Sequence, residues 1–285
     1  MSWQQIEPLD EQFHRMEEGG YVSCYLLRGS DRSALIDSGF GLVDPRPLIE
    51  PLVGKNPLVL NTHVHPDHSN GNRWFEGTGV MGRLEWQTHG RKWNANTHRI
   101  PDGGWQPSKM ILASGYADHL PEGFDPEVYD RFVARGIPEP VRLLDDGEVV
   151  DLGGVRLEAW HTPSHTRGHL CFYEPRRRWL FAGDAIARPG PLWLHLKCRA
   201  SPEQMDRTYR MLADRADRVD KIFPAHGQIP LAGSFLKTFY EGWQQVRAGR
   251  VAGREVQTVG GPGVRFDLDG WGVITSNEAL GDGTV

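Results

Sequence analysis

Four potential metal ligands lie within six residues of one another in the first half of the chain. Residues 62–68 read THVHPDH and come directly after the short apolar run at 58–60 and Asn61. A strand that ends in a loop can turn several such side chains toward one point. Imidazole nitrogens bind Zn, Mn or Fe, and a carboxylate offsets the charge of the ion. The pattern predicts a metal site whose candidate ligands are His63, His65, Asp67 and His68.

Three later segments carry the same residue types, each after a run that is typical of a strand. Residues 161–169 read HTPSHTRGH, and their three histidines cannot all be direct ligands of one small site. The others can orient the ligands through hydrogen bonds, as residues around metal sites commonly do. Gly183-Asp184 and His226-Gly227 follow two further apolar runs. Taken singly, the first of these pairs is also typical of a turn and the second of an ordinary loop.

Taken together, the four motifs resemble one family. The order His-x-His-x-Asp-His, Thr-Pro-x-His-Thr, Gly-Asp and a late His-Gly, spread over residues 20–230, is similar to the metallo-β-lactamase superfamily. The resemblance implies an α+β fold, an αββα sandwich of two mixed β-sheets flanked by helices. It also implies a site for two divalent metal ions, with Zn²⁺ expected and Fe or Mn as alternatives. In that site one ion is held by His63, His65 and His165, the second by Asp67, His68 and His226, and Asp184 bridges both.

The resemblance also implies a reaction. Two ions about 3.5–4 Å apart share a bridging water and lower its pKa, so that hydroxide attacks a carbonyl. Asp67 is the candidate catalytic residue, as acceptor and later donor of the water's proton. Many β-lactam hydrolases of this fold have Cys or Ser at position 184, whereas Asp184 is typical of hydroxyacylglutathione hydrolases and lactonases. We therefore expect a cytoplasmic hydrolase of a small ester, lactone or thioester.

Other functions share this fold. The alternatives are a β-lactam hydrolase with the same two-metal mechanism and a persulfide oxygenase with one iron. The acidic net charge argues against a nuclease. The presence of all seven ligands argues against a non-enzymatic binding protein. The sequence departs from two of these subfamilies. Ala187 stands where lactonases place a tyrosine, and the basic C-terminal residues that bind glutathione in hydroxyacylglutathione hydrolases are not recognisable.

The motifs do not assign a role to several residues near them. His161 is interpreted as structural or as an orienting residue, and His169 as a supporting one. His195 follows Asp184 by eleven residues and has no motif around it. Specificity is expected from residues 83–140, a Trp-rich insertion or lid that also fits a long surface loop, and from 189–196. There Trp193 and Leu194 would either line an apolar pocket or pack in the core.

Strands and helices must position these motifs. Strands are predicted at 21–28, 34–36, 58–60, 155–159, 170–173 and 179–182. A helix is predicted from Ser201, because Ser201-Pro202-Glu203-Gln204 forms a capping box with proline at the first helical position. A short helix is expected over 44–53 with Asp44 as its N-cap, and a last one over 234–247.

Composition bounds the remaining possibilities. The 285 residues carry 37 acidic and 32 basic side chains, which argues against a general nucleic-acid-binding protein. No apolar run approaches the 18 or so residues that cross a bilayer, and residues 1–10 lack the features of a secretory signal. The three cysteines fit a reducing cytoplasm. We expect a hydrolase domain over 1–250, an extension of unknown role over 251–285, and a small-molecule substrate without a nucleic-acid or membrane partner. A homo-oligomer is left open.

Overall fold

The computed structural model describes residues 2–92, 107–113, 120–258 and 260–276. The chain forms two compact units. The first unit comprises Met1–Asp145 and Asp151–Val155, and the second comprises Asp146–Val150 and Arg156–Val285. Trp93, Trp105, His98 and His119 lie outside the described residues. The prediction of one domain over 1–250 with an extension after it stays a prediction.

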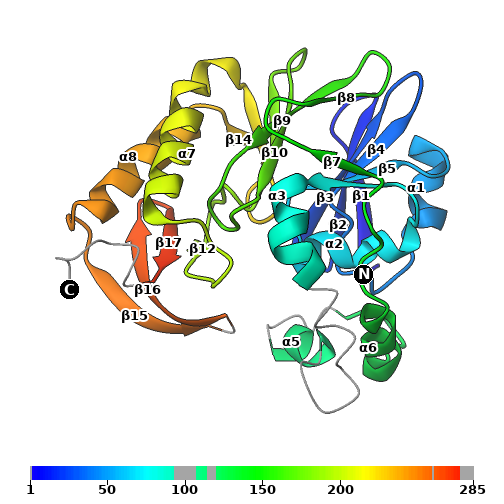
Figure 1. Ribbon diagram of the computed structural model, residues 1–285, viewed down its shortest axis with the longest axis horizontal. Coiled ribbons are helices and arrows are strands. Elements are labelled where there is room, and N and C mark those ends of the chain that lie inside the picture. The colour runs from blue at the N-terminus through cyan, green and yellow to red at the C-terminus, as the bar shows by residue number, and fades with distance from the viewer. Residues whose placement is uncertain (1, 93–106, 114–119, 259, 277–285) are drawn as a thin grey trace. The chain divides into compact units, whose positions relative to one another are not determined.

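A seven-stranded mixed sheet forms the centre of the first unit (Figure 1). The strands follow one another in sequence order; the first four are antiparallel, and β4 to β7 are parallel. Because parallel strands end at the same edge, the segments after β4 and β5 come together there. The strands are β1 (Gln4–Pro8), β2 (Phe13–Glu18), β3 (Val22–Arg28), β4 (Ser33–Ile36), β5 (Leu58–Asn61), β6 (Gly79–Gly82) and β7 (Arg142–Leu144).

Short helices connect the parallel strands of this sheet. The predicted helix after β4 exists, but Asp44 is not its N-cap: the helix begins at Arg46, with Pro45 at the N-cap position. The Asp44 carboxylate accepts the Arg46 backbone N–H and also pairs with the Arg46 guanidinium, so the side chain stabilises a turn before the helix. The helices are α1 (Arg46–Val53), α2 (Pro66–Ser69), the 3₁₀ helix η1 (Asn70–Trp74), α3 (Arg83–Glu85), the π-helix η2 (Trp86–Gly90), α5 (Pro107–Ala113) and α6 (Pro126–Ala134).

Helix α6, within the predicted insertion 83–140, is tied to the rest of the first unit by buried polar contacts. The Tyr129 hydroxyl donates to the Phe40 carbonyl (3.1 Å) and accepts the Asn70 side-chain amide (3.0 Å). The buried Arg73 guanidinium donates to the Val133 carbonyl (2.8 Å) and to the Asn70 carbonyl (2.9 Å). Side-chain hydrogen bonds therefore hold α6 to the rest of the first unit.

Two sheets make up the second unit. The predicted strands at 155–159, 170–173 and 179–182 are confirmed, with small changes at their ends. The six-stranded sheet runs β14-β13-β11-β10-β9-β8, and the four-stranded sheet runs β12-β17-β16-β15. The strands are β8 (Val149–Asp151), β9 (Arg156–His161), β10 (Leu170–Glu174), β11 (Trp179–Gly183), β12 (Pro191–Leu194), β13 (Lys221–Pro224), β14 (Leu231–Ala232), β15 (Gly253–Thr258), β16 (Gly261–Leu268) and β17 (Trp271–Thr275).

Two long helices pack side by side over the core of the second unit (Figure 1). These are α7 (Pro202–Asp214) and α8 (Phe235–Arg247), and the 3₁₀ helix η5 (Ala216–Arg218) follows α7. The predicted capping box at Ser201 is confirmed, because Ser201 Oγ accepts the Gln204 N–H and Gln204 Oε1 accepts the Ser201 N–H. The cap fixes where α7 begins.

Residues 251–258 and 260–276, to which the sequence assigned no role, contain three strands that form a β-meander. β15, β16 and β17 are antiparallel neighbours, and β17 pairs in parallel with β12. The sheet is anchored to α8, where the Trp271 ring stacks on Phe239 with centroids 4.4 Å apart. Gly242 makes room for this ring, since a Cβ there would lie 2.4 Å from it.

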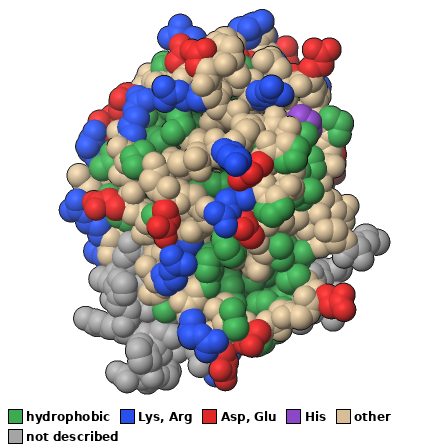
Figure 2. Space-filling model, turned by 90° about the vertical axis from the view of Figure 1, so that its right-hand side faces the viewer, with side chains coloured by type: hydrophobic (Ala, Val, Ile, Leu, Met, Phe, Trp, Pro, Cys, Tyr) green, Lys and Arg blue, Asp and Glu red, His purple; other side chains and the backbone are tan. Residues whose placement is uncertain are grey.

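Acidic and basic side chains are mixed on the face drawn in Figure 2, around a group of apolar ones. The described residues of this face form no continuous basic surface. None of the helices in the described ranges is both long and apolar enough to span a membrane.

Candidate metal centre

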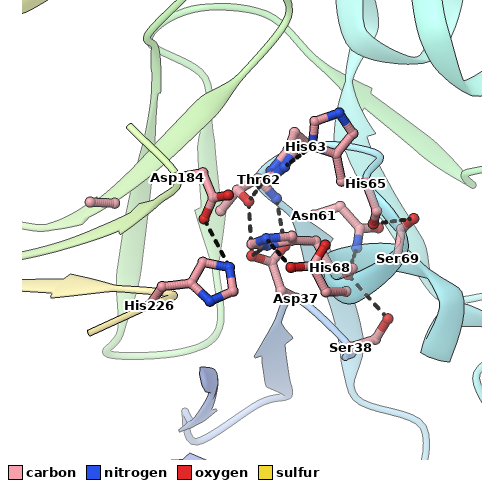
Figure 3. A network of polar contacts seen from close by, with 12 residues as sticks. Asp37, Ser38, Asn61, Thr62, His63, His65, His68, Ser69, Asp184 and His226 are labelled. Atoms are coloured by element: carbon pink, nitrogen blue, oxygen red, sulfur yellow. Dashed lines mark hydrogen bonds and ion pairs between the residues drawn. The ribbon is translucent and has the colours of Figure 1, made fainter. Parts of the chain in front are cut away.

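The edge of the first sheet brings two buried polar segments together. Asp37 follows β4, and Thr62 follows β5. Thr62 donates its backbone N–H to Asp37 Oδ1 and its hydroxyl proton to Oδ2, both at 2.8 Å. His68 in α2 donates its Nδ1 proton to Asp37 Oδ2, also at 2.8 Å (Figure 3). Asp37 thereby fixes the start of the motif at 62–68 and the ring of its last histidine.

These hydrogen bonds determine which ring nitrogens carry lone pairs. Because the Thr62 hydroxyl proton goes to Asp37, the hydroxyl oxygen accepts from His63 Nδ1 at 3.1 Å. His63 Nε2 is then a lone-pair atom, and it lies 3.0 Å from His65 Nδ1. His68 Nε2 is a lone-pair atom by the same reasoning, and it lies 3.6 Å from Asp67 Oδ2. In this last pair an acceptor faces an acceptor, and a cation between them would offset the repulsion.

Asp37 was not among the sequence-predicted site residues, and its contacts lead to a prediction. Asp37→Asn keeps the shape and tolerates the positive φ of +56° at this position, but it removes the charge and one acceptor. We expect the affinity for zinc to fall about 10- to 100-fold, as is usual when a group that orients a ligand is lost. Competition of the apoprotein with a chromogenic zinc chelator measures this affinity.

The matched control for that experiment is Asp31→Asn, which changes an exposed carboxylate in the turn between β3 and β4. Zinc binding by the control should equal that of the wild type. Equal affinities of Asp37→Asn and the control would contradict an orienting role for Asp37.

The second unit contains the other three sequence-predicted ligands, with His165 and His226 next to Asp184. β11 and β13 are parallel, so Asp184 and His226 follow strands that end at the same edge. His226 Nε2 lies 3.4 Å from Asp184 Oδ1, and His165 Nε2 lies 3.4 Å from Oδ2. His165 donates its Nδ1 proton to the Trp193 carbonyl (2.5 Å), which leaves Nε2 as a lone-pair atom toward the carboxylate. One carboxylate thus has an imidazole at each oxygen, as a bridging ligand would.

The remaining two histidines of residues 161–169 have separate roles. His169 is buried, and its Nε2 accepts the Asp184 backbone N–H at 3.2 Å. Its Nδ1 must then donate to Thr162 Oγ1, at 2.9 Å. His169 therefore contacts the backbone of Asp184, and its supporting role stays a prediction. His161 is partly exposed and contacts the Arg167 carbonyl (3.0 Å).

The donor set in each unit fits divalent metal ions. Imidazole nitrogens with their lone pairs available and carboxylate oxygens are the ligands that zinc and related ions take. At a tetrahedral zinc with Zn–N of about 2.0–2.1 Å, two nitrogen ligands lie roughly 3.3 Å apart. The 3.0 Å between His63 and His65 is close to this separation. Within the first unit the structure assembles His63, His65, Asp67 and His68, and within the second His165, Asp184 and His226.

Glu18, at the end of β2, is fully buried beneath the loop that follows Asp37. Its carboxyl accepts from the Gln4 side chain (2.9 Å) and from the Phe40 backbone N–H (2.8 Å). A Cβ at Gly39 would lie 2.2 Å from Glu18 Oε2, so this loop position requires glycine. Burial raises the pKa of Glu18 from 4.5 to about 7.

This raised pKa predicts a pH-dependent stability. Between pH 4.5 and about 7 the unfolded chain releases the Glu18 proton while the folded chain retains it. Stability is therefore lost as pH rises through this window. In urea unfolding with chelator present, Glu18→Gln should gain about 2–3 kcal/mol relative to wild type between about pH 5 and pH 7.5. Glu11→Gln, at an exposed site, is the control, and an equal pH profile for all three proteins would refute the prediction.

Comparison with known proteins identifies the family. A model described as the metallo-beta-lactamase superfamily matches residues 18–226. The chain belongs to this superfamily. The match confirms the resemblance drawn from the four motifs, and the chain is accordingly a metal-dependent hydrolase of the metallo-β-lactamase superfamily.

The chain is also similar to individual members of the superfamily. It is 28% identical over 236 residues to an acyl-coenzyme A thioesterase, MBLAC2, of Gallus gallus, and the match covers 76% of each chain. A hydroxyacylglutathione hydrolase of Hyphomonas neptunium is 29% identical over 129 residues, which is 45% of this chain and 33% of the relative.

Solved structures confirm the predicted fold. A metallo-beta-lactamase family protein of Thermus thermophilus has a TM-score of 0.59 at 23% identity, over 88% of this chain and 81% of that one. A sec-alkylsulfatase of Pseudomonas sp. has a TM-score of 0.62 at 17% identity, over 86% of this chain and 42% of that one. The α+β class and the metallo-β-lactamase fold are thus confirmed.

Proposed function

We propose that this metallo-β-lactamase superfamily member is a dinuclear-metal thioesterase. In this proposal His63, His65 and His165 hold one ion, Asp67, His68 and His226 hold the other, and Asp184 bridges both. The family relationship supports this assignment, as does the chemistry of the donors within each unit. The observation that carries the substrate class is the match to the acyl-coenzyme A thioesterases over 76% of both chains.

The protein side chains have defined tasks in this reaction. When bound, the two ions would supply a water of lowered pKa and polarise the scissile carbonyl. Asp67 accepts the proton of that water and returns it as the thiol leaves. Asp37 keeps His68 in the tautomer with Nδ1 protonated, and the Trp193 carbonyl does the same for His165. Both Nε2 atoms therefore remain available as ligands, without a shift of protons.

Two sequence features favour acyl thioesters over the alternatives. Ala187 lacks the hydroxyl that lactonases of this fold direct at the substrate carbonyl. The basic residues that hold glutathione in hydroxyacylglutathione hydrolases are not recognisable either. We propose zinc as the metal, given the imidazole and carboxylate donors. We also propose the cytoplasm as the compartment, which the small number of cysteines supports.

A substrate panel with metal analysis tests the proposal. The purified protein, loaded with zinc, is assayed with acetyl-, octanoyl- and palmitoyl-coenzyme A, a hydroxyacylglutathione, a lactone and nitrocefin. We expect two zinc ions per chain and the highest kcat/KM with an acyl-coenzyme A. Higher kcat/KM with nitrocefin or the lactone would overturn the thioesterase assignment. One iron per chain, with oxygen uptake in the presence of a persulfide, would overturn the hydrolase mechanism.

Two histidine variants show whether turnover depends on the proposed ligands. His165→Gln should lose most of the activity and the metal. His161→Gln, four residues away, is the control, because the His161 ring is partly exposed and contacts the Arg167 carbonyl rather than a proposed ligand. Equal loss of metal in the two variants would contradict the ligand assignment.

A further inference from the structure

The orientation of His165 depends on a strand that the C-terminal sheet holds in place. The carbonyl that accepts the His165 Nδ1 proton belongs to Trp193 in β12. β12 is an edge strand whose one neighbour in its sheet is β17, with Trp193 opposite Ile274. The position of this carbonyl is therefore set by residues 271–275, which lie beyond the region that the family model matches.

A second contact holds the end of β12. His195 follows the strand directly, is 7% exposed, and its Nε2 lies 2.7 Å from Thr258 Oγ1. The Thr258 hydroxyl donates its own proton to the Gly261 carbonyl (2.8 Å) and accepts the Gly260 N–H (3.1 Å). Thr258 has no second proton to give, so His195 Nε2 must be the donor. The last residue of β15 thus binds the residue that directly follows β12.

The residues around His195 leave little room for another orientation of its ring. Its ring meets Trp193 edge-on, with centroids 5.4 Å apart. A Cβ at Gly263 would lie 3.2 Å from the His195 ring, and one at Gly260 would lie 2.3 Å from Leu196. Burial lowers the pKa of His195, which favours the neutral ring with a single proton.

We propose that His195 and Thr258 are positioning residues for the metal ligand His165. Their hydrogen bond fixes β12 against the C-terminal sheet, and β12 presents the Trp193 carbonyl that orients the His165 ring. The C-terminal sheet is thereby part of the metal-binding machinery, although it supplies no ligand. This inference rests on the proposed role of His165 as a ligand and not on the identity of the substrate.

Zinc titration of matched threonine variants tests the proposal. Thr258→Val keeps the shape of the side chain and removes its hydroxyl, whereas Thr258→Ser keeps the hydroxyl. Thr238→Val is the control, because Thr238 is an exposed residue of α8 and lies outside the C-terminal sheet. With apoprotein and a competing chelator, we expect Thr258→Val to bind one of two zinc ions about tenfold more weakly. Thr258→Ser and Thr238→Val should bind both ions as the wild type does.

A second pair of variants makes the test independent of how well Thr258→Val folds. His195→Leu removes the donor, and His195→Gln provides a side-chain N–H to replace it. Weaker zinc binding by His195→Leu with recovery in His195→Gln supports the proposal, with thermal unfolding of each apoprotein recorded alongside. Wild-type zinc affinity in both Thr258→Val and His195→Leu would overturn it. If the wild type bound two zinc ions but hydrolysed no thioester, the proposed function would fail, and the titrations would still decide this inference.

Discussion

Asp184→Asn should lower kcat/KM for the best acyl thioester by about a thousandfold or more. The asparagine has one oxygen in place of two and no charge, while His165 and His226 each lie 3.4 Å from a different oxygen of Asp184. A thousandfold loss corresponds to about 4 kcal/mol, within the several kcal/mol that metal ions contribute to such reactions. Metal content should fall from two ions per chain to one or fewer.

Metal analysis and steady-state kinetics on the same preparation check this result. Asp217→Asn is the control, because the Asp217 side chain is 85% exposed and pairs with Lys237. The control should retain two ions and full activity. Two tightly bound ions in Asp184→Asn would contradict the bridging role, whatever the activity.

Asp67→Asn should lower kcat about 10²- to 10⁴-fold even when zinc is saturating, which is the usual contribution of a general acid or base. Asp67 lies in the first turn of α2, with its side chain 19% exposed and Oδ2 3.6 Å from His68 Nε2. The substitution removes both a ligand charge and a proton acceptor. Added zinc distinguishes these two losses. Excess zinc restores occupancy of a weakened metal site, but it does not replace a missing proton acceptor.

The measurement is kcat at increasing zinc concentration, with bound metal determined at each point. Asp31→Asn again serves as the exposed control. If kcat returned to the wild-type value once two ions were bound, Asp67 would be a ligand only, and the proton-transfer role would be withdrawn.

Local sequence rules predicted much of the framework. The capping box at Ser201 fixes the start of α7, because the hydrogen bonds it predicts lie within four residues. The error at Asp44 has a local cause too: its carboxylate binds the Arg46 N–H and guanidinium, and this turn competes with the cap. Apolar runs predicted the strands that carry the motifs, because their burial in a sheet outweighs other preferences.

Long-range contacts account for what the sequence did not reveal. Asp37 reads as the start of a turn, and only the parallel pairing of β4 with β5 brings it to Thr62 and His68. Single hydrogen bonds, to partners up to 28 residues away in the sequence, distinguish the environments of His161, His165 and His169. The full seven-ligand set stays a prediction, which the variants above address.

The docking of α6 bears on how the protein can be redesigned. Tyr129 contacts both the Phe40 carbonyl and the Asn70 amide, and Arg73 reaches from η1 to the Val133 carbonyl at the end of α6. A chimera that receives this helix from another superfamily member would have to carry a tyrosine and a free carbonyl at matching positions. Otherwise the buried Arg73 guanidinium would lose its acceptor at Val133, and the buried Asn70 amide would lose its acceptor at Tyr129. Transfer of α6 between superfamily members should therefore succeed where the donor and the recipient share these hydrogen-bonding groups.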